Sequence, residues 1–172
     1  MAEKVIYTDG SCSGNPGPGG WSCILIDGQN VYAYCGREDD TTNNRMELRG
    51  LLKALNLADR YFEDKFEIIC DSAYCVKMCT EWIYNWAANG WKTAAKRSVQ
   101  NVDLVQEAYQ YLVDFPNFAI RRCEGHAGVM GNELADALAT GNLKRFQFLL
   151  DYNNLTLQSL EEEDLDCSNL TL

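Results

Sequence analysis

The sequence predicts one mixed α/β domain, and three observations lead to this fold class. First, residues 4–35 contain three apolar, β-preferring stretches joined by short glycine-containing links, a pattern typical of an antiparallel meander. Second, residues 41–70 place a helical pattern before another short strand, and a strand–helix–strand order implies parallel pairing through a right-handed crossover. Third, 172 residues with 47% hydrophobic residues suffice for one domain with a real core.

Strands are expected where apolar and β-branched residues cluster between turn signals. Asp27-Gly28 is such a signal, and it separates the second strand from the third. The five expected strands cover residues 5–9, 21–26, 31–35, 66–70 and 118–122.

Helices are expected where apolar residues recur at helical spacing behind a capping residue. A first helix starts within residues 41–44, because short hydroxyl and amide side chains cap free backbone N–H groups, and its apolar face repeats through Leu55. Ser72 and Asn132 are expected to cap two later helices. The later helices are expected over residues 72–79, 82–91, 102–112 and 133–142.

Four acids lie at the ends of these elements or in early helical turns. Asp9 ends the first strand, directly before a loop rich in glycine and proline that a bulky ligand can approach. The other three are Glu47, Asp71 and Asp136. Each acid alone is explained as a surface charge, and Asp9 alone as a polar strand end that runs into a hairpin.

Together these acids and their surroundings resemble the bacterial, type 1 ribonuclease H family. The resemblance rests on the strings TDGSCSGNPGPGGW, TTNNRMEL, the DS of DSAY, and GHAGVMGNELADALA, which occur in family order. A further string, WIYNWAANGWKT followed by VQNVDL, is similar to the family's substrate-binding protrusion. The resemblance covers residues 4–141 and is highly specific, because five separate strings coincide.

The resemblance implies a ribonuclease H-like fold, with a mixed five-stranded sheet and helices on both faces. It implies an endonuclease that hydrolyses the RNA strand of RNA–DNA hybrids and leaves 5′-phosphate and 3′-hydroxyl ends. Asp9, Glu47, Asp71 and Asp136 fall on the family's metal-binding acids. His126, in a glycine-rich loop, falls on its mobile catalytic histidine; without the acids, a lone loop histidine is more simply solvated.

The physical chemistry of the acids agrees with this resemblance. Four clustered carboxylates repel one another and raise one another's pKa values, whereas divalent cations among them turn them into ligands. Oxygen ligands favour Mg²⁺ or Mn²⁺ over zinc. Two Mg²⁺ ions per site, with Mn²⁺ as the alternative, support in-line hydrolysis without a covalent intermediate.

The resemblance also implies residues that bind the hybrid. Cys12, Asn15, Asn43 and Asn44 match positions that line the substrate groove, and Thr42 matches part of a pocket for a DNA phosphate. For the two neighbouring asparagines, helix capping is a strong alternative. Asn132 precedes Asp136 by one helical turn, so it either orients water or substrate at the same site or serves only as the cap.

The protrusion is the one locally basic stretch of an acidic chain. Trp82, Trp86 and Lys92 are expected to clasp the DNA strand, together with Trp91, Lys96 and Arg97, although at least one tryptophan is expected to fill a satellite core. Residues 87–89 are Ala-Ala-Asn, where bacterial relatives often carry a basic cluster. We therefore expect weaker affinity for the hybrid than in a basic relative.

Residues 1–145 are expected to form the catalytic domain and residues 146–172 an acidic tail. Two basic residues stand against six acidic ones in residues 142–172, and the whole chain carries a net charge of −10. The tail is expected to be disordered and without a role; the alternatives are a docking segment for a protein partner or a mimic of nucleic acid. Apolar residues at 146 and 148–150 leave open that its first part packs on the domain.

A monomer in the cytoplasm is the expected state. No apolar run is long enough to span a bilayer, and the N-terminus lacks a signal-peptide pattern. All eight cysteines are therefore expected to be free thiols in a reducing compartment.

Two other functions compete with the hybrid nuclease. A non-catalytic module that binds hybrids would be expected to lack at least one of the four acids, and all four are present. A related nuclease or strand-transfer enzyme acting on DNA fits the acids but not the TTNNRMEL and GHAG strings. Cleavage of hybrid, duplex DNA and duplex RNA side by side separates the three.

Overall fold

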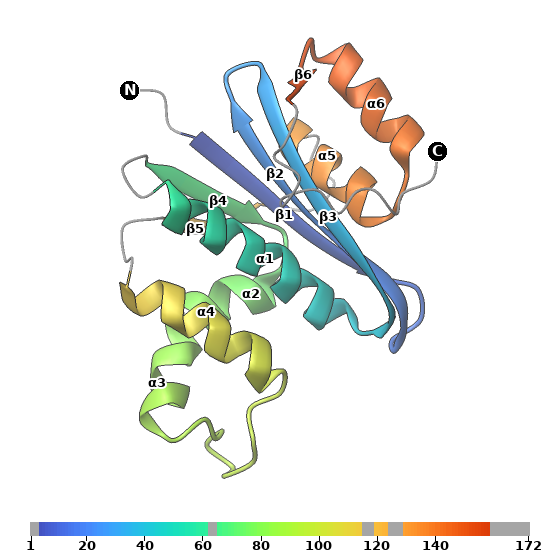
Figure 1. The fold of residues 1–172 in the computed structure, drawn as a ribbon. Helices are drawn as coiled ribbons and strands as arrows, with labels where there is room; N and C mark the ends of the chain where they lie inside the picture. Colours follow the sequence, from blue (N-terminus) through green and yellow to red (C-terminus); the bar gives the residue numbers. More distant parts are fainter. Residues whose placement is uncertain (1–3, 62–64, 115–118, 124–128, 159–172) are drawn as a thin grey trace.

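One mixed sheet of six strands organises the computed structural model, which describes residues 4–61, 65–114, 119–123 and 129–158 (Figure 1). The strand order is β5-β4-β1-β2-β3-β6. The strands are β1 (Lys4–Cys12), β2 (Gly17–Asp27), β3 (Asn30–Thr41), β4 (Phe66–Cys70), β5 (Ala119–Arg122) and β6 (Thr156–Leu157).

The pairing of the strands confirms the predicted topology. β1, β2 and β3 form an antiparallel meander, whereas β4 pairs parallel to β1 and β5 parallel to β4. The predicted number of strands is wrong by one. β6 adds a sixth strand, because its two residues pair parallel to Asn30 and Val31 at the start of β3.

Helices cover both faces of the sheet (Figure 1). They are α1 (Asn43–Arg60), α2 (Ala73–Lys77), a π-helical turn η1 (Met78–Trp82), α3 (Ile83–Ala88), α4 (Val102–Asp114), α5 (Met130–Ala139) and α6 (Leu143–Tyr152). Thr42 and Ser72 cap α1 and α2 as predicted. Asn132 does not cap a helix, because α5 already begins at Met130 after Val129.

The alternation of side chains along the strands produces two cores. Cys23 and Leu25 of β2 lie in the larger core with residues of α1 and α4. Ile24 of β2 lies in the second core, with Leu134 of α5 and residues of α6. Since side chains alternate between the two faces of a strand, β2 is apolar on both faces.

Helix α6 crosses the predicted domain boundary at residue 145. Asn142 caps it, because its Oδ1 accepts a hydrogen bond from the Arg145 backbone N–H at 3.1 Å. Phe146, Leu149 and Leu150 are buried in the second core, whereas Phe148 is exposed. The first part of the predicted tail therefore packs on the domain, and residues 159–172 lie outside the described residues.

Among the residues that the structure describes, six cysteines are free thiols, at positions 12, 23, 70, 75, 79 and 123. Cys35 is disulfide-bonded, so the expectation of eight free thiols is wrong at this residue.

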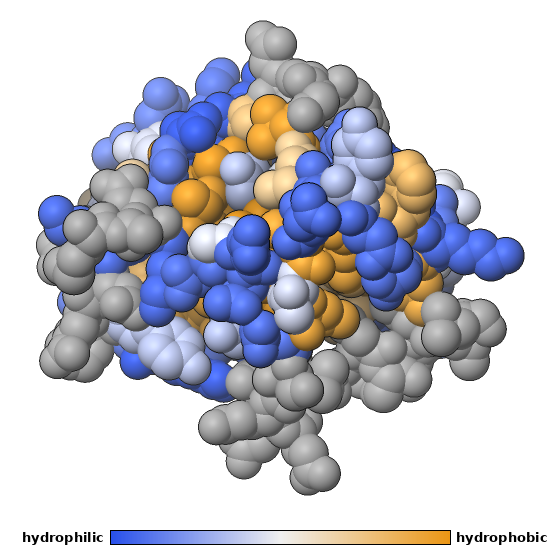
Figure 2. Space-filling view, turned by 90° about the horizontal axis from the view of Figure 1, so that it is seen from above, coloured by the Kyte–Doolittle hydropathy of each residue, from blue (hydrophilic) through white to orange (hydrophobic). Residues whose placement is uncertain are grey.

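Figure 2 shows the molecule from above, relative to the view of Figure 1. On this face hydrophilic residues surround the hydrophobic ones and separate them into patches. Among the described helices, none combines the length and the apolar character that a membrane span requires.

Strand β1 and helix α1 approach each other closely at Gly10. A Cβ atom there would lie 2.3 Å from the backbone nitrogen of Glu47, so only glycine fits without moving the backbone. Gly50 makes a second close approach, where a Cβ would lie 2.8 Å from the Ser22 carbonyl oxygen. These contacts set the distance between the strand and the helix.

Replacing Gly10 by alanine is expected to lower the free energy of unfolding by about 1–3 kcal/mol, because the backbones of β1 and α1 must separate. Chemical denaturation measures the change. Gly28→Asn is the control: Gly28 has a φ of 63°, which asparagine tolerates, and a Cβ added there would have no neighbouring atom within 4 Å. Equal stability of Gly10→Ala and the parent chain would contradict the close approach.

Candidate active site

Three of the four predicted acids meet at one edge of the sheet. Asp9 is in β1, Asp71 directly follows β4, and the two strands are parallel neighbours whose C-terminal ends lie side by side. Glu47 comes from the first turns of α1, which packs on β1 at Gly10. Carboxylate oxygens of these three residues lie within 4.8 Å of one another.

Asp136 joins this cluster from the opposite face of the sheet. It lies on α5, and its carboxylate is close enough to Asp9 to contribute to the raised pKa of Asp9. Asp9 and Glu47 likewise interact, and Asp9 accepts a hydrogen bond from the Gly10 backbone N–H at 2.9 Å. Asp9 therefore interacts with all three of the other acids.

Burial and mutual repulsion shift the titration of the two innermost acids. Burial, followed by the charge of Asp71, raises the pKa of Asp9 above its ordinary value. Burial, followed by the charges of Asp9 and Asp71, raises the pKa of Glu47. The Gly10 N–H opposes both shifts without cancelling them. The folded chain thus holds protons at this site that a bound cation would displace.

The residues fit a hard divalent cation. The donors are carboxylate oxygens, the ligand type that such cations prefer. Glu47 Oε2 is buried and has no hydrogen-bond partner among the described atoms, although an orphaned buried acceptor is unfavourable. A cation among Asp9, Glu47 and Asp71 would satisfy this oxygen and neutralise the repulsion.

The glycine-rich loop after β1 contacts the N-terminus of α1. Cys12 Sγ donates to carbonyl oxygens of the loop and lies 3.4 Å from the carbonyl oxygen of Thr41. Asn15 Oδ1 accepts from the Asn43 backbone N–H at 3.1 Å. Thr42 caps α1, because its Oγ1 accepts a hydrogen bond from the Arg45 backbone N–H at 3.2 Å. Asn43 and Asn44 are exposed. The structure thus joins the loop that carries Cys12 and Asn15 to the start of α1, the helix that carries Glu47.

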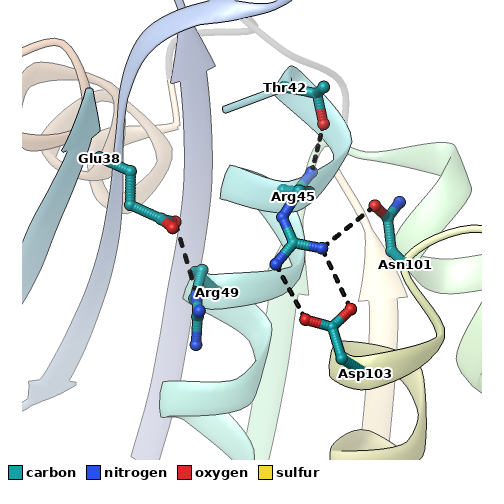
Figure 3. Close-up of polar contacts among 6 residues, drawn as sticks. All are labelled: Glu38, Thr42, Arg45, Arg49, Asn101 and Asp103. Atoms are coloured by element: carbon teal, nitrogen blue, oxygen red, sulfur yellow. Dashed lines mark hydrogen bonds and ion pairs between the residues drawn. The ribbon is translucent and has the colours of Figure 1, made fainter. Parts of the chain in front are cut away.

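Arg45 fastens this end of α1 to α4 (Figure 3). Its guanidinium donates two hydrogen bonds to Asp103, at 3.1 and 2.9 Å, and a longer one to Asn101 at 3.4 Å. The bidentate pair raises the pKa of Arg45 and lowers that of Asp103 through the shared hydrogen bonds. Sequence reasoning missed this brace, although Arg45 stands in the TTNNRMEL string and both partners in VQNVDL.

The protrusion is built around an aromatic row. Trp82 packs on Tyr74 and on Trp86, with ring centroids 6.1 and 5.7 Å apart. These three rings line a hollow of about 270 Å³, together with Thr93, Arg97, Ser98, Val99 and Gln100. Trp91 instead meets Tyr109 of α4 edge-on at 5.3 Å, and it packs against the larger core.

His126, Asn132 and Lys92 complete the set of predicted site residues. His126 lies outside the described residues. Asn132 is buried at 3% exposure in the first turn of α5, one helical turn before Asp136. Lys92 is exposed on the protrusion and forms an isolated bridge with Ser98.

Comparison with known proteins assigns the family. The family model described as RNase H matches residues 1–144. The chain belongs to the ribonuclease H family. The ribonuclease H of Ruegeria pomeroyi is 44% identical over 152 residues, which cover 86% of this chain and 96% of the relative. The ribonuclease H of Janthinobacterium sp. is 49% identical over 139 residues, which cover 81% and 94%.

A solved ribonuclease H agrees with the fold. The structure described as LC9-RNase H1, a type 1 RNase H with the type 2 active-site motif, matches with a TM-score of 0.69 and 26% identity. The match covers 94% of this chain and 90% of that chain. As a member of the ribonuclease H family, the chain is a metal-dependent hydrolase that acts on RNA–DNA hybrids.

The repulsion among the acids predicts that the metal-free protein loses stability as the pH rises. The folded-state pKa values of Asp9 and Glu47, about 8 and about 9, exceed the ordinary carboxyl values of 3.8 and 4.5. The folded state therefore binds more protons than the unfolded state in this window, and stability is greatest below it. Thermal unfolding in a chelator, at about pH 5 and about pH 8, measures the loss.

The variant Asp9→Asn is expected to flatten this pH dependence and to be more stable than the parent chain at the higher pH, because it removes the central charge. Saturating Mg²⁺ is expected to flatten the pH dependence of stability for the parent chain and not for the variant. If the parent chain and the variant lose stability equally with pH in the chelator, the acids do not repel one another as described.

Proposed function

We propose that this ribonuclease H cuts the RNA strand of an RNA–DNA hybrid with two Mg²⁺ ions, which Asp9, Glu47, Asp71 and Asp136 hold. The products are a 5′-phosphate and a 3′-hydroxyl end. The observation that carries the proposal is the meeting of Asp9, Glu47 and Asp71 carboxylate oxygens within 4.8 Å, with Asp136 close enough to raise the pKa of Asp9. Asp9, Glu47, Asp71 and Asp136 would supply the oxygen ligands for both cations.

The ions supply the chemistry that no side chain here provides: when bound, they activate water and stabilise the leaving 3′ oxygen. The protein side chains would hold the ions and orient the hybrid. Mn²⁺ takes the same oxygen ligands and is the expected substitute. In this proposal His126 carries a proton or helps the product to leave, the role that its position in GHAG implies.

The loop residues would read the RNA strand. Cys12 and Asn15 contact the chain at the start of α1, where Asn43 and Asn44 stand in the turn before Glu47. Short amides and backbone N–H groups suit the 2′-hydroxyl, which both donates and accepts. Thr42 would contribute to the grip on a DNA phosphate. Asn132, buried one turn before Asp136, would orient the site from within α5 rather than cap it.

The aromatic row would hold the DNA strand. Trp82 and Trp86 line a hollow that also contains Arg97, and rings beside a guanidinium suit sugar and phosphate contacts. Lys92 is exposed on the same protrusion. The proposed working form is a cytoplasmic monomer. A protein partner for the acidic residues 161–166 stays a prediction.

The decisive experiment compares cleavage of a labelled RNA–DNA hybrid with cleavage of duplex DNA and duplex RNA, each with Mg²⁺. Only the hybrid is expected to be cut. The variant Asp9→Asn is expected to lower kcat by a factor on the order of 10³, because the site would lose a charged carboxylate that holds the metal. Asp114→Asn, which removes an exposed acid at the end of α4, is the matched control and is expected to retain full activity. Hybrid binding without cleavage by the parent chain would favour a binding module instead.

A second prediction concerns the missing basic cluster on the protrusion. Ala88 is exposed at the end of α3, so Ala88→Lys adds a charge without disturbing a core. Hybrid affinity is expected to rise, and the slope of log affinity against log salt concentration is expected to steepen by about 1. Ala119→Lys on the edge strand β5, away from the protrusion, is the control. Unchanged binding by Ala88→Lys would remove the protrusion from the DNA-binding surface.

A further inference from the structure

Arg145 of α6 forms an ion pair with one of the four acids. Its Nη1 donates to Asp136 Oδ2 at 2.8 Å. The pair is partly sheltered, since the side chains of Arg145 and Asp136 are 37% and 25% exposed. Arg145 itself is not one of the residues proposed to hold the ions or to bind the hybrid.

The position of Arg145 is fixed by the fold. It stands in the first turn of α6, and its backbone N–H is held by the Asn142 cap. The next residue, Phe146, is buried in the second core with Leu149 and Leu150. The Arg145 guanidinium is therefore held next to Asp136 by a helix that packs on the domain.

The four acids differ in whether a basic side chain forms an ion pair with them. Among the residues that the structure describes, no lysine or arginine forms an ion pair with the carboxylates of Asp9, Glu47 or Asp71. Arg122 approaches Asp71, but its Nε donates to the backbone oxygen at 3.2 Å. Among the described residues, Asp136 is thus the one of the four acids whose carboxylate forms an ion pair with a basic side chain.

We propose that Arg145 is a built-in counter-cation that holds Asp136 in place and weakens the binding of a divalent ion between Asp9 and Asp136. A guanidinium on one carboxylate oxygen takes up part of the negative charge and repels a second cation nearby. The ion among Asp9, Glu47 and Asp71 lacks this competitor. Arg145 is thus a positioning residue that makes the two ion sites unequal. The inference rests on the proposed two-ion function.

The test is calorimetric titration of the metal-free full-length chain with Mn²⁺, without substrate. The parent chain is expected to bind two ions, one more tightly than the other. Arg145→Gln is expected to lower the Kd of the more weakly bound ion about fivefold and to change the Kd of the more tightly bound ion by less than about twofold. The Mg²⁺ concentration for half-maximal cleavage of the hybrid is expected to fall in parallel. Arg145→Lys keeps the charge and is expected to restore most of the parent behaviour.

Lys144→Gln is the matched control, since Lys144 is the exposed neighbour on the same helix and the variant loses the same charge. It is expected to leave both Kd values unchanged. Equal shifts in Arg145→Gln and Lys144→Gln would overturn the proposal, because net charge alone would then explain them. Lower thermal stability of Arg145→Gln with unchanged Mn²⁺ binding would also overturn it and leave Arg145 as a brace for α6. A parent chain that binds one ion without substrate, and whose cleavage of the hybrid also depends on a single Mg²⁺ ion, would instead overturn the proposed two-ion function.

Discussion

The contact between β1 and α1 at Gly10 is the constraint on which the active site depends. With no side chain between them, the strand brings the Asp9 carboxylate and the helix brings the Glu47 carboxylate within 4.8 Å of each other. The parallel pairing of β4 with β1 then adds Asp71 at the same edge, and α5 adds Asp136 from the other face. A sheet with helices on both faces is thus the means by which four acids, separated along the chain, are held together.

The same arrangement works against the stability of the metal-free chain. Two buried acids with raised pKa values and an orphaned carboxylate oxygen are features that a domain selected for stability alone would lack. Here they lie next to a glycine contact and helices that leave the acids little room to move apart. Cations bound among these acids would offset their repulsion.

Most of the fold was readable from the sequence, because turn signals and apolar periodicity define β1 to β4 and α1 directly. The acids were found because they stand at element ends and match family strings. Three features were not readable. β6 has two residues and no pattern of its own. The start of α5 at Met130 depends on packing, since Val129 offers no capping side chain. The Arg145–Asp136 pair joins two helices, and no local pattern reports such a contact.

The two cores give the chain an order of assembly during synthesis. The meander, α1 and β4 precede α5 and α6 in the chain, so the larger core can form while the second core is still open. At that stage one face of β2 and β3, with Ile24, Val31 and Ala33, lacks its cover. A nascent chain that pauses before α5 would therefore carry three of the four acids, an uncovered apolar sheet face and an open binding surface for chaperones.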